Sequence, residues 1–220
     1  MFNKLLEQLN SLLDQLKSLL QKKKETDEIG EPGIGPCLAS PAGPVSVDEK
    51  TALEIIRTGM EESETNARNS MLSGTGHRDI KLLNNKFRTK IEKFMEECEK
   101  EGIDVFPIET YRSAERQDRL FKQSPKVTNA RGYESLHNYG WACDFGVRKD
   151  DGTLDWNTKG ENWIKFVKIA RKYFTCGADW GDYGHVSLNP LVELTGNTKY
   201  KTKSEGALIL KKKFQKLEWI

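Results

Sequence analysis

The sequence predicts an α+β domain in which helices flank a small antiparallel sheet, with an amphipathic helix at the N-terminus. Short segments of strand character occur between longer segments whose apolar residues recur every three or four positions. The later strands are separated by gaps short enough for hairpins, which favours antiparallel pairing. A lean hydrophobic content of 36% over 220 residues indicates one core with polar extensions.

The first 46 residues differ in composition from the rest of the chain. Leucines recur at spacings of three and four and predict an amphipathic helix over residues 1–24. A lone helix with this apolar stripe is not stable in water, so we expect it to self-associate or to dock on a protein partner. Contact with a membrane surface and packing against the rest of the same chain are the alternatives. Residues 25–46 are rich in Gly, Pro, Ala and Ser and predict a linker.

Three helices are expected after the linker. Helix resumes near residue 47, with Ser46 as its N-cap, and forms a helical lead-in over residues 47–78. Amphipathic patterns predict further helices from Asp79 to Lys100 and from Glu161 to Tyr173. We expect the apolar faces of these two helices to pack on the sheet.

Three short strands are expected, at residues 105–109, 142–147 and 184–188. Side chains alternate between the two faces of a strand. Asp144 is therefore expected on the face opposite to Cys143 and Phe145.

The charge of the chain is nearly balanced, with 35 basic and 33 acidic residues and a net charge of +2. We expect no nucleic-acid partner, because no basic tract with interleaved aromatic residues is present. Lysines are frequent over residues 193–220, which we interpret as a basic C-terminal extension with a solvated face, or as a weak attraction for an anionic cell wall. No apolar stretch reaches the ~20 residues of a membrane span, and no secretory signal is recognisable.

Four cysteines are scattered without the paired spacing of a zinc ribbon. Cys98 falls on a predicted helix and Cys143 on a predicted strand, and Cys37 and Cys176 complete the set. The pattern indicates free buried thiols and synthesis in a reducing compartment.

Two of the three histidines lie beside acids in glycine-flanked segments, and together they suggest a catalytic zinc site. His137, Asp144 and His185 supply the three protein ligands that such a site uses, and the fourth position is left to water. Asp182, three residues before His185, is the candidate general base, and Asp179 is its competitor. On spacing alone, ordinary hydrogen-bonding roles for these side chains are as well supported as a metal site.

Three motifs in the same order resemble a family of zinc peptidases. The segment Ser135-Leu-His-Asn-Tyr-Gly-Trp-Ala-Cys-Asp-Phe145 resembles the Ser-x-His-x-x-Gly-x-Ala-x-Asp-Phe signature of this family. Gly181–Leu188 resembles its Asp-x-x-His element, and Tyr111–Phe121 is similar to its Tyr-Arg-Ser-x-x-x-Gln-x-x-Leu segment. The family includes D-alanyl-D-alanine carboxypeptidases, vancomycin-resistance D,D-dipeptidases and phage L-alanyl-D-glutamate endolysins. The resemblance covers roughly residues 80 to 190 and implies a zinc peptidase domain over residues 79–192 with a Hedgehog/D,D-peptidase-like fold.

The resemblance also implies roles for individual residues. It assigns Zn²⁺ binding to His137, Asp144 and His185 and acid–base catalysis to Asp182. Arg112 matches an arginine that binds substrate or stabilises the oxyanion, although a structural salt bridge is the other reading. Ser135 and Gln117 match positions that bind substrate or orient the metal ligands. Gly184 and Ser187 stand where many relatives have a proline and an acid, which leaves the substrate preference open.

The predicted function is zinc-dependent hydrolysis of an amide bond in peptidoglycan stem peptides, of the L-Ala-D-Glu endopeptidase or the D-Ala-D-Ala carboxypeptidase type. The absence of a recognisable secretory signal favours a phage or prophage cell-wall hydrolase that is made in the cytoplasm and acts on the wall after release. One alternative is a catalytically inactive, zinc-containing module that binds peptidoglycan or a protein. Another is an assembly protein dominated by the helix at residues 1–24.

Overall fold

The computed structural model describes residues 46–73, 76–200 and 206–220. The predicted helix over residues 1–24, nearly all of the predicted linker, and Cys37 lie outside the described residues. Pro44–Ile220 forms one compact unit. The predicted helical lead-in, peptidase domain and basic extension therefore belong to the same unit.

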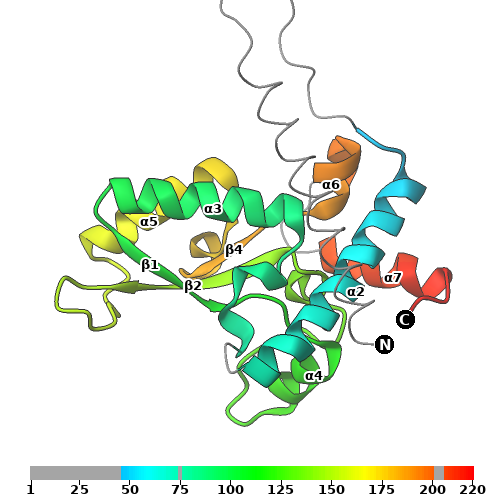
Figure 1. The fold of residues 1–220 in the computed structure, drawn as a ribbon, viewed down its shortest axis with the longest axis horizontal. Helices are drawn as coiled ribbons and strands as arrows, with labels where there is room; N and C mark the ends of the chain where they lie inside the picture. The colour runs from blue at the N-terminus through cyan, green and yellow to red at the C-terminus, as the bar shows by residue number, and fades with distance from the viewer. Residues whose placement is uncertain (1–45, 74–75, 201–205) are drawn as a thin grey trace, which may run out of the picture. The chain divides into compact units, whose positions relative to one another are not determined.

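The described residues form helices and strands in mixed order (Figure 1). The helices are α2 (Glu49–Ser73), α3 (Asn85–Lys100), α4 (Ala114–Lys122), α5 (Glu161–Tyr173), α6 (Pro190–Thr195) and α7 (Gly206–Lys216). The strands are β1 (Asp104–Glu109), β2 (Ala142–Arg148), β3 (Thr175–Cys176) and β4 (His185–Ser187). Short 3₁₀ turns connect them: η1 (Gly76–Arg78), η2 (Ile80–Leu82), η3 (Leu136–Tyr139), η4 (Gly177–Trp180) and η5 (Thr198–Tyr200).

The strands form one antiparallel sheet in the order β1-β2-β4-β3. This confirms the predicted fold class. The three predicted strands correspond to β1, β2 and β4, and the two-residue strand β3 at the edge was not predicted. Such a short strand leaves no periodic pattern in the sequence.

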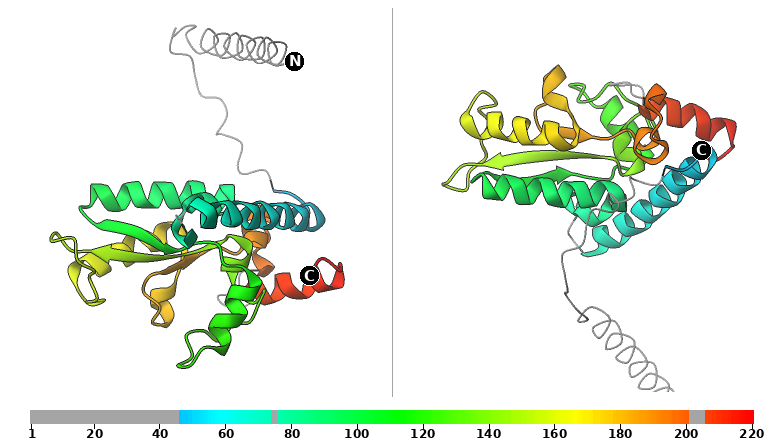
Figure 2. Two further views of the ribbon diagram at one scale, coloured as in Figure 1. Left: turned by 60° about the horizontal axis from the view of Figure 1, so that its bottom comes forward. Right: turned by 90° about the horizontal axis from the view of Figure 1, so that it is seen from above.

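Helices α3 and α5 lie side by side along one face of the sheet (Figures 1 and 2). Phe94 of α3 lies at the centre of this core, with ring centroids 5.3 Å from both Phe145 of β2 and Phe166 of α5. All three side chains are buried. Because side chains alternate along β2, Asp144 faces away from these helices, toward the opposite side of the sheet.

The predicted helix boundaries are partly confirmed. Helix α5 spans Glu161–Tyr173 as predicted. Ser46 is not the N-cap of α2, because the helix begins at Glu49 and the Asp48 carboxylate accepts the backbone N–H of Thr51.

Helix α3 does not begin at Asp79, as predicted. Asp79 caps η2, and α3 begins at Asn85 with Asn84 as its N-cap. The predicted helical segment contains two residues that can cap, and the chain uses both. It therefore makes a short 3₁₀ turn before the longer helix.

Helix α7 belongs to the core and is not merely a solvated extension. Leu210 and Phe214 are fully buried, and the Phe214 ring lies 5.6 Å from that of Tyr139 in η3. Lys213 pairs with Glu49 of α2, and Lys211 pairs with Glu134 at 2.8 Å. The C-terminal helix thus supports η3, the turn that carries His137.

Cys98, Cys143 and Cys176 are free and buried, which confirms the prediction for the described cysteines. Burial raises the pKa of Cys98 to about 12. Within the described part of the chain, no helix has the length and apolarity needed to cross a membrane.

Candidate metal centre

Three polar residues lie next to one another across three adjacent strands. Asp144 in β2 pairs with Glu109 of β1 on one side and with His185 of β4 on the other. The Asp144 Oδ1 atom lies 2.9 Å from Nδ1 of His185 and 3.3 Å from Nε2 of His137. One carboxylate oxygen is therefore within reach of both imidazoles.

His137 is placed by η3, whose two ends are held by capping residues. Ser135 is the N-cap: its Oγ accepts the backbone N–H of His137 at 3.4 Å, and the Asn138 side chain accepts the N–H of Ser135 in return. Gly140 ends the turn with φ 70°, a left-handed conformation that glycine adopts without strain. The turn thus presents a buried His137 toward Asp144.

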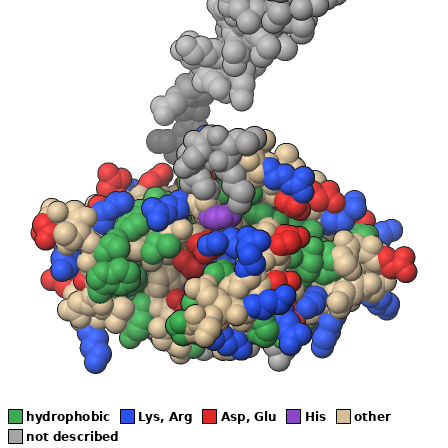
Figure 3. Space-filling model, turned by 90° about the horizontal axis from the view of Figure 1, so that it is seen from below, with side chains coloured by type: hydrophobic (Ala, Val, Ile, Leu, Met, Phe, Trp, Pro, Cys, Tyr) green, Lys and Arg blue, Asp and Glu red, His purple; other side chains and the backbone are tan. Residues whose placement is uncertain are grey.

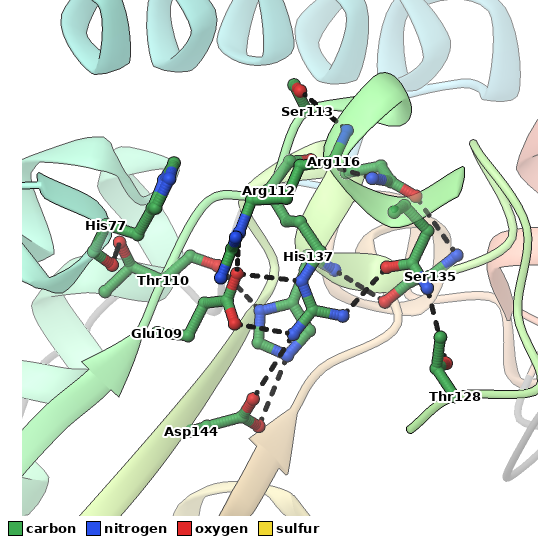
Figure 4. A network of polar contacts seen from close by, with 12 residues as sticks. His77, Glu109, Thr110, Arg112, Ser113, Arg116, Thr128, Ser135, His137 and Asp144 are labelled. Atoms are coloured by element: carbon green, nitrogen blue, oxygen red, sulfur yellow. Dashed lines mark hydrogen bonds and ion pairs between the residues drawn. The ribbon is translucent and has the colours of Figure 1, made fainter. Parts of the chain in front are cut away.

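The residues that follow β1 fix the orientation and tautomer of His137 (Figure 4). The Nδ1 atom of His137 lies 2.6 Å from the carbonyl oxygen of Thr110. A carbonyl can only accept a hydrogen bond, so Nδ1 donates to it and Nε2 is the ring nitrogen that faces Asp144. The backbone N–H of Arg112 donates to the His137 carbonyl, and the Asn138 amide donates to the Arg112 carbonyl. The imidazole is therefore prepared to bind a cation through Nε2.

The donor set fits a divalent metal such as zinc. One potential ligand atom from each of His137, Asp144 and His185 lies within 4.8 Å of the others. Burial by itself raises the pKa of the Asp144 carboxyl, but the charge and hydrogen bonds of the two imidazoles outweigh it and hold this pKa well below its usual range. The carboxylate is therefore ionised and can act as a ligand at neutral pH. Two imidazoles and one carboxylate form a combination found in catalytic zinc sites.

Asp182 lies on the loop between η4 and β4 beside this cluster. Its backbone N–H donates to the Gly177 carbonyl, and its own carbonyl accepts the N–H of His185. A Cβ atom on Gly177 would lie 2.2 Å from the Asp182 carbonyl oxygen, so this tight loop requires glycine. Although Asp182 is exposed, partial desolvation of its carboxyl raises the pKa, and the charge of Asp144 adds to the rise against the opposing effect of His185.

The competing candidate base, Asp179, has a different environment. Its carboxylate lies 2.8 Å from the Arg171 guanidinium in an ion pair. This pairing ties η4 to α5. Asp182 is better suited to proton transfer because its carboxylate makes no hydrogen bond to the described residues and its pKa is raised.

Arg112 lies beside the metal ligands, but most of its donors are already used (Figure 4). Its Nε and Nη2 atoms donate to the two carboxylate oxygens of Glu109 at 2.9 and 3.0 Å, and Nη1 donates to Gln117 at 2.8 Å. Nη2 also lies 3.6 Å from Oδ2 of Asp144. The guanidinium is buried, with only a tenth of its side chain exposed. The structural salt bridge considered for Arg112 is therefore present.

Gln117 and Ser135 hold other residues of the site in place: Gln117 contacts Arg112, and Ser135 caps η3. Gln117 is fully buried: its amide oxygen accepts from Arg112, and its nitrogen donates to the Ala130 carbonyl at 2.8 Å. Direct contact of Gln117 with a substrate is therefore not supported. Ser135 acts through the cap of η3, as described above. Both residues orient groups that face the cluster.

Glu109 and Thr110 are site residues that the sequence did not identify. Burial by itself raises the pKa of Glu109, but hydrogen bonds from Arg112 and Arg116 outweigh it and lower this pKa to about 2. The Thr110 hydroxyl donates to the His77 carbonyl, and its own carbonyl holds His137. A contact made by a backbone carbonyl, such as that of Thr110, leaves no signal in a sequence. Glu109 could have been noticed, because it is an acid three residues before Arg112.

Residues 80–175 match the family model of D-alanyl-D-alanine carboxypeptidase VanY. The peptidoglycan L-alanyl-D-glutamate endopeptidase CwlK of Bacillus subtilis (strain 168) is 42% identical over 105 residues, which cover 40% of this chain and 63% of that protein. The match therefore spans less than two thirds of this relative.

Two solved structures have similar folds at 18% identity. The LdcB LD-carboxypeptidase has a TM-score of 0.40, and the match covers 60% of this chain and 64% of that one. The vancomycin-resistance D,D-dipeptidase VanXYg, solved with a D-Ala-D-Ala phosphinate analogue, has a TM-score of 0.38, with 58% and 59% covered. The family resemblance predicted from the three motifs is confirmed for residues 80–175, which match the D-alanyl-D-alanine carboxypeptidase (VanY) family.

Proposed function

We propose that this protein is a zinc-dependent peptidase that hydrolyses an amide bond in peptidoglycan stem peptides. The observation that carries the proposal is the convergence of His137, Asp144 and His185, with the tautomer of His137 fixed by Thr110. The match to the carboxypeptidase family and the similarity to an L-alanyl-D-glutamate endopeptidase support the substrate class. Both an endopeptidase and a carboxypeptidase are compatible with this site.

In the proposed site, Nε2 of His137, the Asp144 carboxylate and Nδ1 of His185 would hold a zinc ion. A zinc ion held there would supply a Lewis acid and lower the pKa of a coordinated water. Asp144 contributes the negative charge that favours binding of the cation. The Thr110 carbonyl accepts from Nδ1 of His137 and so directs Nε2 toward Asp144.

In this proposal Asp182 moves the protons of the reaction. Its carboxylate accepts a proton from the attacking water and returns it to the nitrogen of the leaving amine. A carboxyl with a raised pKa is a stronger base than an ordinary aspartate, which suits the first of these steps. Its position on a loop fixed by the Gly177 carbonyl keeps the base close to His185.

The test is digestion of purified peptidoglycan by the full-length protein, with the new termini identified by mass spectrometry. We expect zinc-loaded wild type to release amino groups at one bond of the stem peptide. Asp182→Asn and chelator-treated protein should lose most of this activity, since general acid–base catalysis contributes about 10²–10⁴-fold. Asp179→Asn is the matched control, because it removes a carboxylate three residues away that is engaged with Arg171.

Cleavage of the L-Ala-D-Glu bond identifies an endopeptidase, and release of D-alanine identifies a carboxypeptidase. Equal activity of wild type and Asp182→Asn would contradict the assigned base. Zinc binding without hydrolysis of any stem peptide would contradict the proposed function and favour a binding module.

A further inference from the structure

A second arginine beside the candidate metal centre, Arg116 of α4, has side-chain nitrogens that make no hydrogen bond to the described residues. Arg116 donates one side-chain hydrogen bond, from Nε to Oε1 of Glu109 at 2.8 Å. Its terminal nitrogens, Nη1 and Nη2, donate to no residue in the described part of the chain. About a third of its side chain is exposed. The planar end of this guanidinium is therefore available to a ligand.

Arg112 offers a direct comparison, because it shares the same acceptor. Oε1 of Glu109 accepts from Nε of Arg112 at 2.9 Å as well as from Arg116. Arg112, however, also uses its terminal nitrogens on Glu109 and Gln117. Arg112 is thus a buried member of the site, whereas Arg116 is about a third exposed and has two terminal nitrogens without a hydrogen bond to the described residues.

The charge of this cluster is not balanced. Two guanidinium groups share the single carboxylate of Glu109. Asp144 adds a negative charge near Arg112, but that charge is committed to a cation when the metal centre is filled. Arg119, one turn further along α4, is exposed and forms no ion pair with the described residues. An anionic group on a ligand would be attracted to this side of the site.

The neighbours of Arg116 leave its positive charge without a further acidic partner among the described residues. His77 lies near it in η1, where burial first and then the charge of Arg116 lower the pKa of the imidazole, so that His77 is neutral at pH 7. Among the acids of α4, Asp118 accepts the backbone N–H of Gly132, and Glu115 is exposed. Figure 3, seen from the side where α4 lies in Figure 1, shows Lys and Arg side chains gathered beside a histidine.

We propose that Arg116 binds a carboxylate of the peptide substrate and thereby determines its specificity. The terminal nitrogens of a guanidinium match the two oxygens of a carboxylate. Arg116 connects to the metal ligands through Glu109 and Arg112, so the bound carboxylate lies a short distance along the peptide from the bond that is cut.

This inference rests on the proposed peptidase function and deepens it. A stem peptide carries such a group in two places: the free carboxylate of D-glutamate and the carboxylate at its C-terminus. The first would lie beside the bond cut by an endopeptidase, and the second beside the bond cut by a carboxypeptidase. The source of the carboxylate is therefore linked to the bond that is cleaved.

The test compares three synthetic pentapeptides of sequence L-Ala-D-Glu-L-Lys-D-Ala-D-Ala. One is unmodified, one is amidated on the free carboxylate of D-Glu, and one is amidated at the C-terminus. kcat and KM are measured for wild type, Arg116→Gln and Arg116→Lys. Arg148→Gln is the matched control, because Arg148 has a similar exposure and a single carboxylate partner, Asp104, at the far end of β1 and β2.

We expect Arg116→Gln to raise KM for the unmodified peptide about tenfold, as for the loss of one hydrogen bond to a charged group, with kcat within about twofold. For one of the two amidated peptides, wild type and Arg116→Gln should have the same KM. The carboxylate that is amidated in that peptide is the one that Arg116 binds. Arg116→Lys should keep part of the preference for the unmodified peptide over the amidated one, because lysine keeps the positive charge but not the planar guanidinium. Arg148→Gln should behave as wild type.

Two results would overturn the inference. The first is hydrolysis of all three peptides by Arg116→Gln as efficiently as by wild type. The second is loss of activity by the same factor with each peptide, which would indicate a structural role. Binding of the unmodified peptide to chelator-treated protein, measured by calorimetry, separates this inference from the proposed function. If no peptide is hydrolysed by wild type, weaker binding by Arg116→Gln still supports the carboxylate site, and unchanged binding overturns it.

Discussion

Replacement of Glu109 by glutamine should destabilise the protein in a pH-dependent manner. Glu109 accepts hydrogen bonds from two arginines, and its side chain is only 12% exposed. Burial opposes its ionisation, but Arg112 and Arg116 lower its pKa from the ordinary value of 4.5 to about 2. A shift of this size corresponds to about 3 kcal/mol of folding free energy at pH 7, at about 1.4 kcal/mol per pKa unit.

The direction of the pH dependence follows from the lowered pKa. The contribution of Glu109 is fully present above pH 4.5, where the carboxyl is ionised in both the folded and the unfolded chain. It is lost as the pH falls toward 2, because the folded protein must then bind the proton as well. The difference in stability between wild type and Glu109→Gln should narrow from about 3 kcal/mol at pH 7 to about 1 kcal/mol at pH 2.5.

The assay is urea denaturation of both proteins, followed by tryptophan fluorescence at several pH values. Glu161→Gln is the control, because Glu161 is an exposed partner of Lys165 on the surface of α5 and should show little effect at any pH. A difference between wild type and Glu109→Gln that is the same at pH 7 and pH 2.5 would refute the ionic account. So would a difference below about 0.5 kcal/mol at pH 7, the level of an ordinary surface substitution.

The structure makes three further predictions, which concern α7, Thr110 and Cys98. Phe214→Ala should lower the free energy of unfolding by about 3–5 kcal/mol, because it removes a buried ring that packs on Tyr139; no change in the urea midpoint would contradict the assignment of α7 to the core. Thr110→Val should weaken zinc binding, whereas Thr110→Ser should preserve it, because valine loses the hydroxyl that donates to the His77 and Asp79 carbonyls and serine keeps it; equal zinc affinities by competition with a chelator would disprove this positioning role. The Cys98 thiol, with its pKa raised by burial to about 12, should react with a thiol reagent only after denaturation; rapid labelling of Cys98 in the native protein, located by mass spectrometry, would show that it is accessible.

Periodic segments and paired motifs could be predicted from the sequence because they depend on local pattern. The apolar spacing within α5 marks both of its ends, and the alternation in β2 places Asp144 opposite to Phe145. The grouping of Asp144 with His185 was expected from their residue types and from the family resemblance, and the structure brings them together by pairing β2 with β4.

The remaining features depend on tertiary contacts that no local pattern records. Asp79 and Asn84 are both competent caps, and only packing decides that α3 starts after the second. The resemblance implied a substrate or oxyanion role for Arg112, with a structural salt bridge as the alternative, and only the folded structure shows that Glu109 and Gln117 accept from its guanidinium. Arg116 is partly exposed, and its terminal nitrogens donate to no residue in the described part of the chain. A side chain that follows the family motif can therefore be less accessible than a neighbour outside the motif.

The central claim is that His137, Asp144 and His185 form a zinc site, and the most direct test is the zinc content of the full-length protein. Wild type, Asp144→Asn and the control Asp104→Asn are stripped with a chelator, reloaded with zinc and measured by elemental mass spectrometry and chelator competition. We expect one zinc per chain in wild type and in the control, and an affinity at least about tenfold weaker in Asp144→Asn, because the site loses its only anionic ligand. Zinc bound equally well by Asp144→Asn, or not bound by wild type, would contradict the claim.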